Sequence, residues 1–104
     1  MMNLTIDLEA ARFPVAPLSL NKILDTFVSS HYDTVTIISI DPLIRRCIEQ
    51  RIEHRELPLL LDEHAETTAI TTQDKQKWLE TFYEEDFEDV DIKTHHVIKR
   101  REVG

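Results

Sequence analysis

The sequence predicts one α/β domain with a central mixed sheet, in which strands and helices follow the order β-α-β-α-β-β-α. Three observations predict it. The chain has 104 residues, 41% of them hydrophobic, which suits one domain. Apolar residues recur with a period of two in some segments and with helical spacing in others. Residues 34–40 are β-branched almost throughout, as is typical of a strand buried on both faces.

The first strand and first helix are separated by a proline-containing segment. Residues 4–8 alternate between apolar and polar, which predicts a strand. Residues 12–17 contain Pro14 and Pro17 and are predicted to form a connection, because proline is excluded from helix interiors and central strands. Leu20, Leu24 and Phe27 then recur at helical spacing, so a helix is expected over residues 20–28 with Ser19 as its N-cap.

The second half of the chain predicts two helices around a pair of short strands. After the strand at 34–40, Asp41 and Pro42 are suited to start a helix, whose apolar stripe includes Ile44 and Ile48. Residues 57–61 and 67–71 are predicted as the two strands of a hairpin. Thr71 or Thr72 caps the third helix. Its apolar face is expected to contain Trp78, Leu79, Phe82 and Tyr83.

The predicted core has a sheet side and a helix side. The sheet side consists of Ile6, Leu8, Val35, Ile37, Ile38, Ile40, Leu59 and Leu61. The helix side consists of Leu24, Phe27, Ile44, Ile48, Leu79 and Phe82.

The last part of the chain, residues 84–104, changes from acidic to basic along its length. It contains five β-branched apolar residues, Val90, Ile92, Val97, Ile98 and Val103. One interpretation is a strand added to a sheet edge, in this chain or in a partner. Another is a frayed tail. The change of charge is also compatible with an antiparallel homodimer formed through this segment.

Composition excludes several functional classes. Twelve basic and twenty acidic residues give a net charge of −8, which disfavours nucleic-acid binding. It is compatible with a basic partner or with solubility alone. The single glycine is Gly104, whereas phosphate-binding loops and nucleophile elbows need internal glycines. No apolar run reaches the ~20 residues of a membrane helix, and no secretory signal is recognisable, so a cytoplasmic protein without membrane contact is expected.

No residue pattern indicates a catalytic or metal site. The single cysteine, Cys47, excludes an intrachain disulfide and a cysteine-based zinc site; it lies on the second helix's apolar stripe and is expected to pack in the core. The histidines lack the spacing of a helical metal site; they are His31, His54, His64, His95 and His96. Asp7 is expected on the solvent side of its strand. Neither a metal nor a cofactor is therefore expected.

The succession of elements over residues 3–86 resembles that of the thioredoxin/glutaredoxin family. Residues 4–10 resemble its first central strand, residues 35–41 its second strand, and residues 77–82 its last helix. Residues 57–61 resemble the segment that opens with the family's cis-proline, here Pro58. The resemblance implies a three-layer sandwich formed by residues 1–86, followed by a C-terminal extension of residues 87–104.

The departure from this family concerns its redox pair. Thioredoxin-type exchange uses two cysteines, one a thiolate of lowered pKa and one that resolves the mixed disulfide. Phe13 and Ala16 stand at those two positions. The resemblance therefore implies a redox-inactive member of the fold.

The leading functional hypothesis is a non-catalytic protein-binding role, as an adaptor, assembly factor or regulatory subunit. The expected surface combines the loop after the first strand with the start of the third strand and the C-terminal segment. Its residues are Arg12, Phe13, Pro14, Leu57, Pro58, Ile92, Val97 and Ile98. Two alternatives stay open: an acidic inhibitor or immunity-type protein that covers a basic partner, and a thiol-using transferase with a non-cysteine site.

Overall fold

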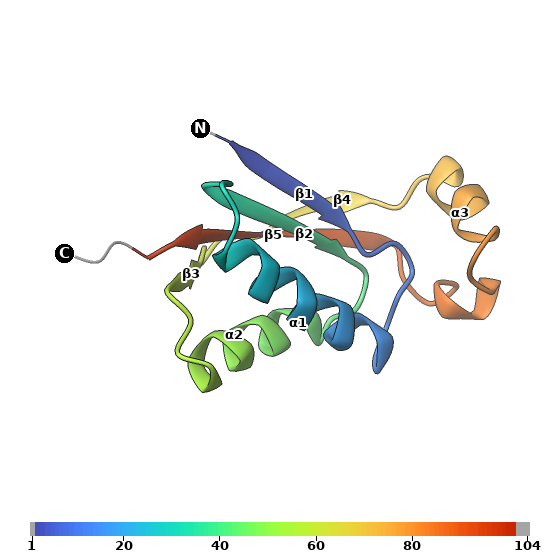
Figure 1. The fold of residues 1–104 in the computed structure, drawn as a ribbon. Helices are drawn as coiled ribbons and strands as arrows, with labels where there is room; N and C mark the ends of the chain where they lie inside the picture. The colour runs from blue at the N-terminus through green and yellow to red at the C-terminus, as the bar shows by residue number, and fades with distance from the viewer. Residues whose placement is uncertain (1, 102–104) are drawn as a thin grey trace.

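The structure of this chain, a computed structural model, describes residues 2–101. Within that range it contains five strands, three α-helices and one 3-10 turn (Figure 1). In chain order these are β1 (Asn3–Asp7), α1 (Val15–Val28), β2 (Thr34–Ser39), α2 (Ile44–His54), β3 (Leu59–Leu61), β4 (Glu66–Ala69), α3 (Thr72–Trp78), η1 (Glu84–Asp86) and β5 (Ile92–Arg100). The predicted α/β class and mixed sheet are confirmed.

The sheet is organised around its last strand. Its order is β1-β2-β5-β3, and β4 also pairs with β5. β1 runs parallel to β2, whereas β5 is antiparallel to each of its three partners. Residues 87–101, predicted to extend a complete domain, thus contain the strand that joins the two halves of the sheet; residues 102–104, with Val103, lie outside the described residues. Both sides of β5 are paired within the chain, so β5 is not an edge strand.

The predicted hairpin of β3 and β4 is wrong, because the two strands do not pair with each other. Both lie along the same side of β5, with Leu61 opposite Ile98 and Glu66 opposite His95. The chain advances five residues from Leu61 to Glu66 while the partners are three apart, so the connection holds two extra residues. It acts as a bulge within one interrupted strand, and the chain does not reverse.

The two long helices cover one face of the sheet (Figure 1). Val35 and Ile37 of β2 and Ile98 of β5 are fully buried, together with helix residues on the facing side. The helix residues of this core include Leu20, Leu24, Phe27, Ile44 and Ile48. α3 lies beyond the end of the sheet, so the described residues form two layers and not the three that the resemblance implied.

Helix α1 begins earlier than the sequence predicted. It starts at Val15 rather than after Ser19, and Pro14 occupies its N-cap position. Pro17 lies in the first turn, where backbone N–H groups have no helical acceptor and proline is tolerated. Ala16 is completely buried, so the segment predicted as a connection already contributes to the core.

A second, smaller cluster closes the end of the sheet beside α3. The rings of Trp78 and Phe87 meet edge to face, with their centroids 5.4 Å apart, and Ala10 and Ile40 pack with them. Leu79, expected in the core, is 54% exposed, because α3 ends at Trp78 and Phe87 fills the buried position. The predicted cap of α3 is confirmed: Thr71 and Asp74 form a reciprocal capping box.

Candidate functional site

Phe13, the aromatic residue of the predicted site, lies at the end of the sheet where the parallel strands β1 and β2 finish. The loop after β1 carries Phe13, whose side chain is 69% exposed. The loop after β2 carries Asp41 and Leu43. In open α/β sheets the carboxyl ends of parallel strands are the usual place for a binding site, so both loops are candidates by position.

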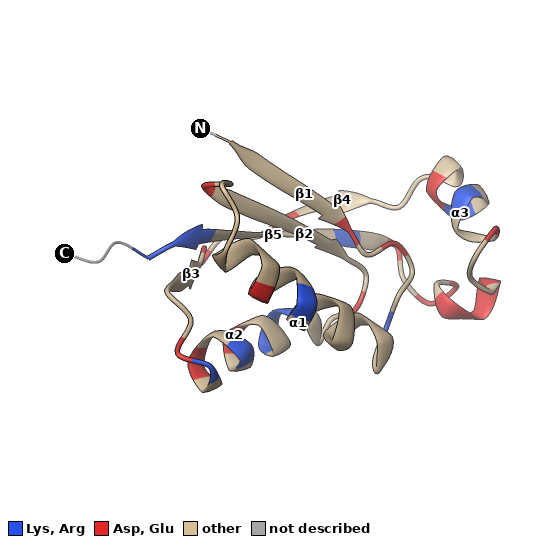
Figure 2. Ribbon diagram, in the orientation of Figure 1, with Lys and Arg blue, Asp and Glu red and all other residues tan. Residues whose placement is uncertain are grey.

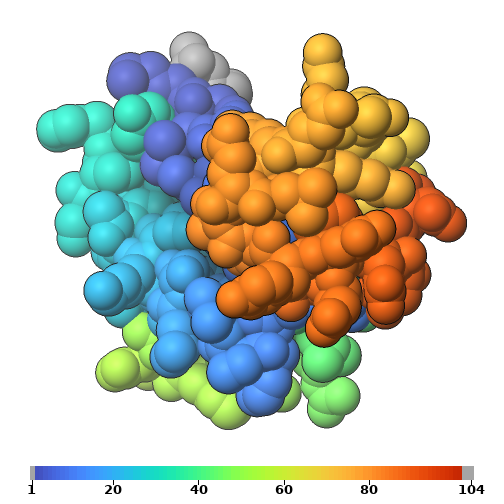
Figure 3. Space-filling view, turned by 90° about the vertical axis from the view of Figure 1, so that its right-hand side faces the viewer, coloured from blue at the N-terminus to red at the C-terminus, as the bar shows by residue number. Residues whose placement is uncertain are grey.

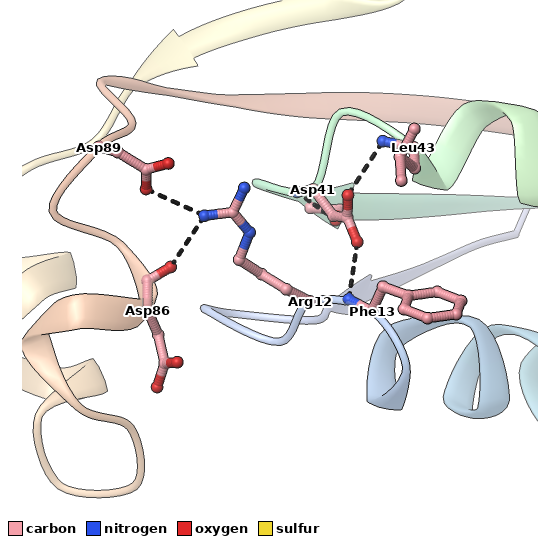
Figure 4. A network of polar contacts seen from close by, with 7 residues as sticks. Arg12, Phe13, Asp41, Leu43, Asp86 and Asp89 are labelled. Atoms are coloured by element: carbon pink, nitrogen blue, oxygen red, sulfur yellow. Dashed lines mark hydrogen bonds and ion pairs between the residues drawn. The ribbon is translucent and has the colours of Figure 1, made fainter.

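One buried carboxylate holds both loops. Asp41 is only 6% exposed, and its Oδ2 accepts the backbone N–H of Phe13 at 2.9 Å while its Oδ1 accepts that of Leu43 at 3.0 Å (Figure 4). Hydrogen bonds to a charged group are about twice as strong as neutral ones. The backbones that carry these two exposed side chains therefore have fixed positions relative to each other.

Arg12 ties the same loop to the segment before β5. Its Nη1 donates to Asp89 Oδ1 at 2.9 Å and to the carbonyl of Asp86 at 3.4 Å (Figure 4). Asp89 is 61% exposed, so this ion pair contributes little to folding stability. Its effect is geometric: Asp41 binds the backbone of Phe13, and Asp86 and Asp89 bind the side chain of the preceding residue, Arg12, so this part of the loop is anchored from two directions.

Four exposed apolar side chains lie on the anchored loops and at the start of α1. Phe13 and Leu43 on the loops and Val15 and Leu18 on α1 are each more than half exposed, and we call these four residues the Phe13 surface. Phe13 and Val15 also line a shallow hollow next to Phe82. Figure 3 shows this end of the molecule, where the blue N-terminal segment lies beside the orange residues that follow α3.

A groove of about 430 Å³ continues from Phe13 between the outer sides of α1 and α2. Its lining residues are Phe13, Pro17, Asn21, Cys47, Gln50, Arg51, His54 and Arg55. Cys47 is half-buried rather than fully in the core. Burial raises the pKa of its thiol, with a further contribution from the Asp41 charge that outweighs the nearby Arg46. The thiol is therefore protonated at neutral pH and is a poor nucleophile.

The predicted site residues do not form one surface. Arg12, Phe13 and Pro14 follow the carboxyl end of β1, whereas Leu57 and Pro58 precede β3, whose Leu59 pairs with Arg100 at the opposite end of the sheet. The cis peptide bond among the described residues joins Phe13 to Pro14, and the one implied before Pro58 is not found.

The predicted site residues of the C-terminal segment are also divided. Ile98 is completely buried under the helices, so its assignment to a binding surface is wrong. Val97 is half-buried and, by the alternation of the strand, lies on the sheet face away from α1 and α2. Ile92, at the start of β5, is the one of the three that is largely exposed.

Sequence patterns alone did not indicate Asp41, Asp89 and Leu43 as parts of this site. Asp41 was assigned only a capping role, although an aspartate directly after a buried strand is also placed to bind a neighbouring loop. The contacts of Arg12 with residues 86 and 89 are long-range, and no local pattern indicates them. Val15 and Leu18 were missed because the start of α1 was placed too late.

Histidines and acidic groups form no metal site in the part of the chain that the structure describes. Asp7 is exposed and accepts the N–H of Glu9 at 2.8 Å, as expected for a solvent-side position. His96 is 4% exposed. Burial, with the nearby charge of Arg45, lowers its pKa to about 4, so it is neutral at physiological pH.

Comparisons of the chain with protein-family models, with curated proteins and with solved structures find no match. Among residues 2–101, no helix combines the length and apolar character needed to cross a membrane. The arrangement of the residues themselves is thus the basis for a functional proposal.

Proposed function

We propose that this chain is a protein-binding module and that the Phe13 surface is its contact with a partner. The observation that carries the proposal is the anchoring of an exposed phenylalanine. The N–H of Phe13 is bound by the buried Asp41, and the adjacent Arg12 is bound by Asp89. An aromatic side chain on a pre-organised backbone loses little conformational entropy on binding, and buried aromatic anchors dominate the energetics of protein interfaces.

The role is proposed to be non-catalytic and redox-inactive. In the thioredoxin resemblance the redox pair falls on Phe13 and Ala16, which carry no thiol. Cys47, in the neighbouring groove, has a raised pKa. The protein-binding proposal is independent of that resemblance, because it depends on the exposure and anchoring of the loop.

The proposal is tested by affinity capture from the source cell extract with the full chain and two variants. Phe13→Asp removes the aromatic anchor, and Leu79→Asp introduces the same charge at an exposed leucine just after α3. A partner bound by the wild type is expected to be retained by Leu79→Asp. It is expected to bind Phe13→Asp about 30-fold more weakly, as for loss of an interface hot spot.

Purified partner titrated against each chain gives the affinities, and circular dichroism verifies that both variants are folded. The proposal is contradicted if the wild-type chain retains no protein. Equal affinity of the partner for the wild type and Phe13→Asp also contradicts it, because the Phe13 surface would then not be the contact.

A further inference from the structure

A second groove lies at the opposite side of α2 from the Phe13 surface. It has a volume of about 660 Å³ and separates α2 from β3. Its apolar lining includes Ile52, Leu57, Leu59 and Leu61. Its acidic lining consists of Glu49, Glu53, Glu56 and Glu63. Apolar surface flanked by an excess of charges of one sign has the character of a binding groove for a partner of the opposite sign.

One wall of this groove is the free edge of the sheet. β3 pairs on one side with β5 and has no strand on its other side among residues 2–101. The N–H of Arg101 donates to the carbonyl of Pro58, and the N–H of Asp62 donates to the carbonyl of Val97. Because an antiparallel ladder alternates, Leu59 and Leu61 direct their backbone groups away from β5.

Three backbone groups are thereby presented at the groove. The N–H of Leu59 donates to the carbonyl of Leu57 at 2.8 Å. This leaves the carbonyl of Leu59 and both the N–H and the carbonyl of Leu61 at the outer edge. Such groups are the template for addition of an extended segment from another chain.

The charges of the groove indicate the sign of that segment. Arg45 and Arg101 are the basic residues of the lining. Arg45 is already engaged, since its Nη2 donates to the carbonyl of Asp62 at 2.8 Å and its Nε lies 3.7 Å from Glu49 Oε1. Glu53, Glu56 and Glu63 take part in none of the ion pairs within residues 2–101, so three carboxylates are available to a ligand.

We propose that this groove binds an extended segment of a partner protein that alternates Lys or Arg with apolar residues, as a strand added to β3. The lysine or arginine side chains would lie on the helix side of the added strand. Their aliphatic stems would cover Ile52 and Leu57, and their charged ends would lie near Glu49 and Glu53 of α2, a helix on which Figure 2 shows acidic residues. This inference goes beyond the Phe13 surface and concerns the other end of the sheet.

The probe is a dye-labelled synthetic peptide of alternating lysine and valine, acetylated and amidated at its ends, with fluorescence anisotropy as the readout. The test variant is Glu53→Lys/Glu56→Lys. The matched control is Glu84→Lys/Glu85→Lys, which makes the same change of net charge on η1. The test variant is expected to bind the probe about tenfold more weakly than the wild type, whereas the control variant should keep most of the affinity.

The strand geometry is tested with a second peptide and a second readout. Replacing the central valine of the probe and the lysine that follows it by two prolines removes a backbone donor on each side of the strand, one of which must face β3, and is expected to abolish binding. The probe should slow hydrogen exchange of the Leu61 amide. The proposal is overturned if the probe does not bind the wild type, if both charge variants weaken binding equally, or if the proline peptide binds as well as the probe. None of these measurements involves Phe13, so their failure would leave the first proposal intact.

Discussion

At the scale of single residues, His96 is the buried group with the clearest consequence for stability. It lies on the helix side of β5, and its Nδ1 has no hydrogen-bond partner among the described residues. Burial and the Arg45 charge lower its pKa from 6.5 to about 4. Between these two values an unfolded chain binds a proton at this imidazole and the folded chain does not, so stability is lost as the pH falls from 6.5 towards 4.

His96→Leu is expected to remove this component of the pH dependence. Between about pH 7 and about pH 4 the wild type should lose about 3 kcal/mol of unfolding free energy more than His96→Leu, at about 1.4 kcal/mol per pKa unit. Urea unfolding at several pH values measures the difference, since carboxylates common to both chains cancel. Parallel stability curves for the two chains would show that His96 titrates normally in the folded state.

Residue-scale prediction from the sequence succeeded where a side chain's environment follows from its own element. Leu24, Phe27, Ile44 and Ile48 are buried as expected, because their helical spacing defines one face. It failed for Leu79, which is exposed because α3 ends one residue earlier. Beside this helix end the ring of Trp78 packs against Phe87, a tertiary contact that no local sequence pattern indicates.

At the scale of elements, the end of α1 is held by a side chain from β5. Arg100 Nη2 donates to the carbonyls of Phe27 and Ser30, at 2.9 and 2.6 Å, and its Nη1 and Nε reach those of Val28 and Tyr32. The guanidinium also lies over the Phe27 ring, 4.8 Å from its centroid. α1 has no basic residue in its own last turn, so Arg100 supplies the positive charge that helix C-termini favour.

Arg100→Lys is expected to destabilise the protein by about 2–3 kcal/mol, because an ammonium cannot reproduce the planar fork that reaches these carbonyls. Arg101→Lys is the matched control, since Arg101 is exposed. Urea midpoints of the three chains compare them directly. An equal, small effect of both substitutions would mean that the Arg100 contacts do not stabilise the helix end.

Prediction at this scale succeeded for element types and failed for pairing. The β-branched run of β2 and the Thr71 cap of α3 are local signals, and both elements are found. The short strands β3 and β4 were assigned to each other because they are neighbours in sequence. Their common partner, β5, comes more than twenty residues later, and the intervening connection does not reverse the chain.

At the scale of the whole molecule, the largest difference from expectation is the place of the last strand. The thioredoxin resemblance implied a domain complete by residue 86. In the structure β5 instead joins the parallel pair β1–β2 to β3 and β4. Strand order depends on contacts between residues far apart in sequence, for which one sequence holds no local signal. Val97 and Ile98 were recognised as strand-like, but nothing in their pattern separates a central strand from an edge strand.

A chain ending at Asp91 should therefore fail to fold. Without β5 the sheet retains only the two-stranded β1–β2 pair, and isolated strand pairs are at best marginally stable in water. The buried Ile98 and the Arg100 contacts with α1 are lost with it. We expect no cooperative urea transition for this chain, whereas a chain ending at Arg101, which keeps every described pairing, should unfold like the full protein. Adding residues 92–101 as a separate peptide is expected to restore the transition, because β5 pairs on both sides. If the chain ending at Asp91 unfolds cooperatively by itself, then the first 91 residues are a complete domain, and the central position of β5 in this fold is wrong.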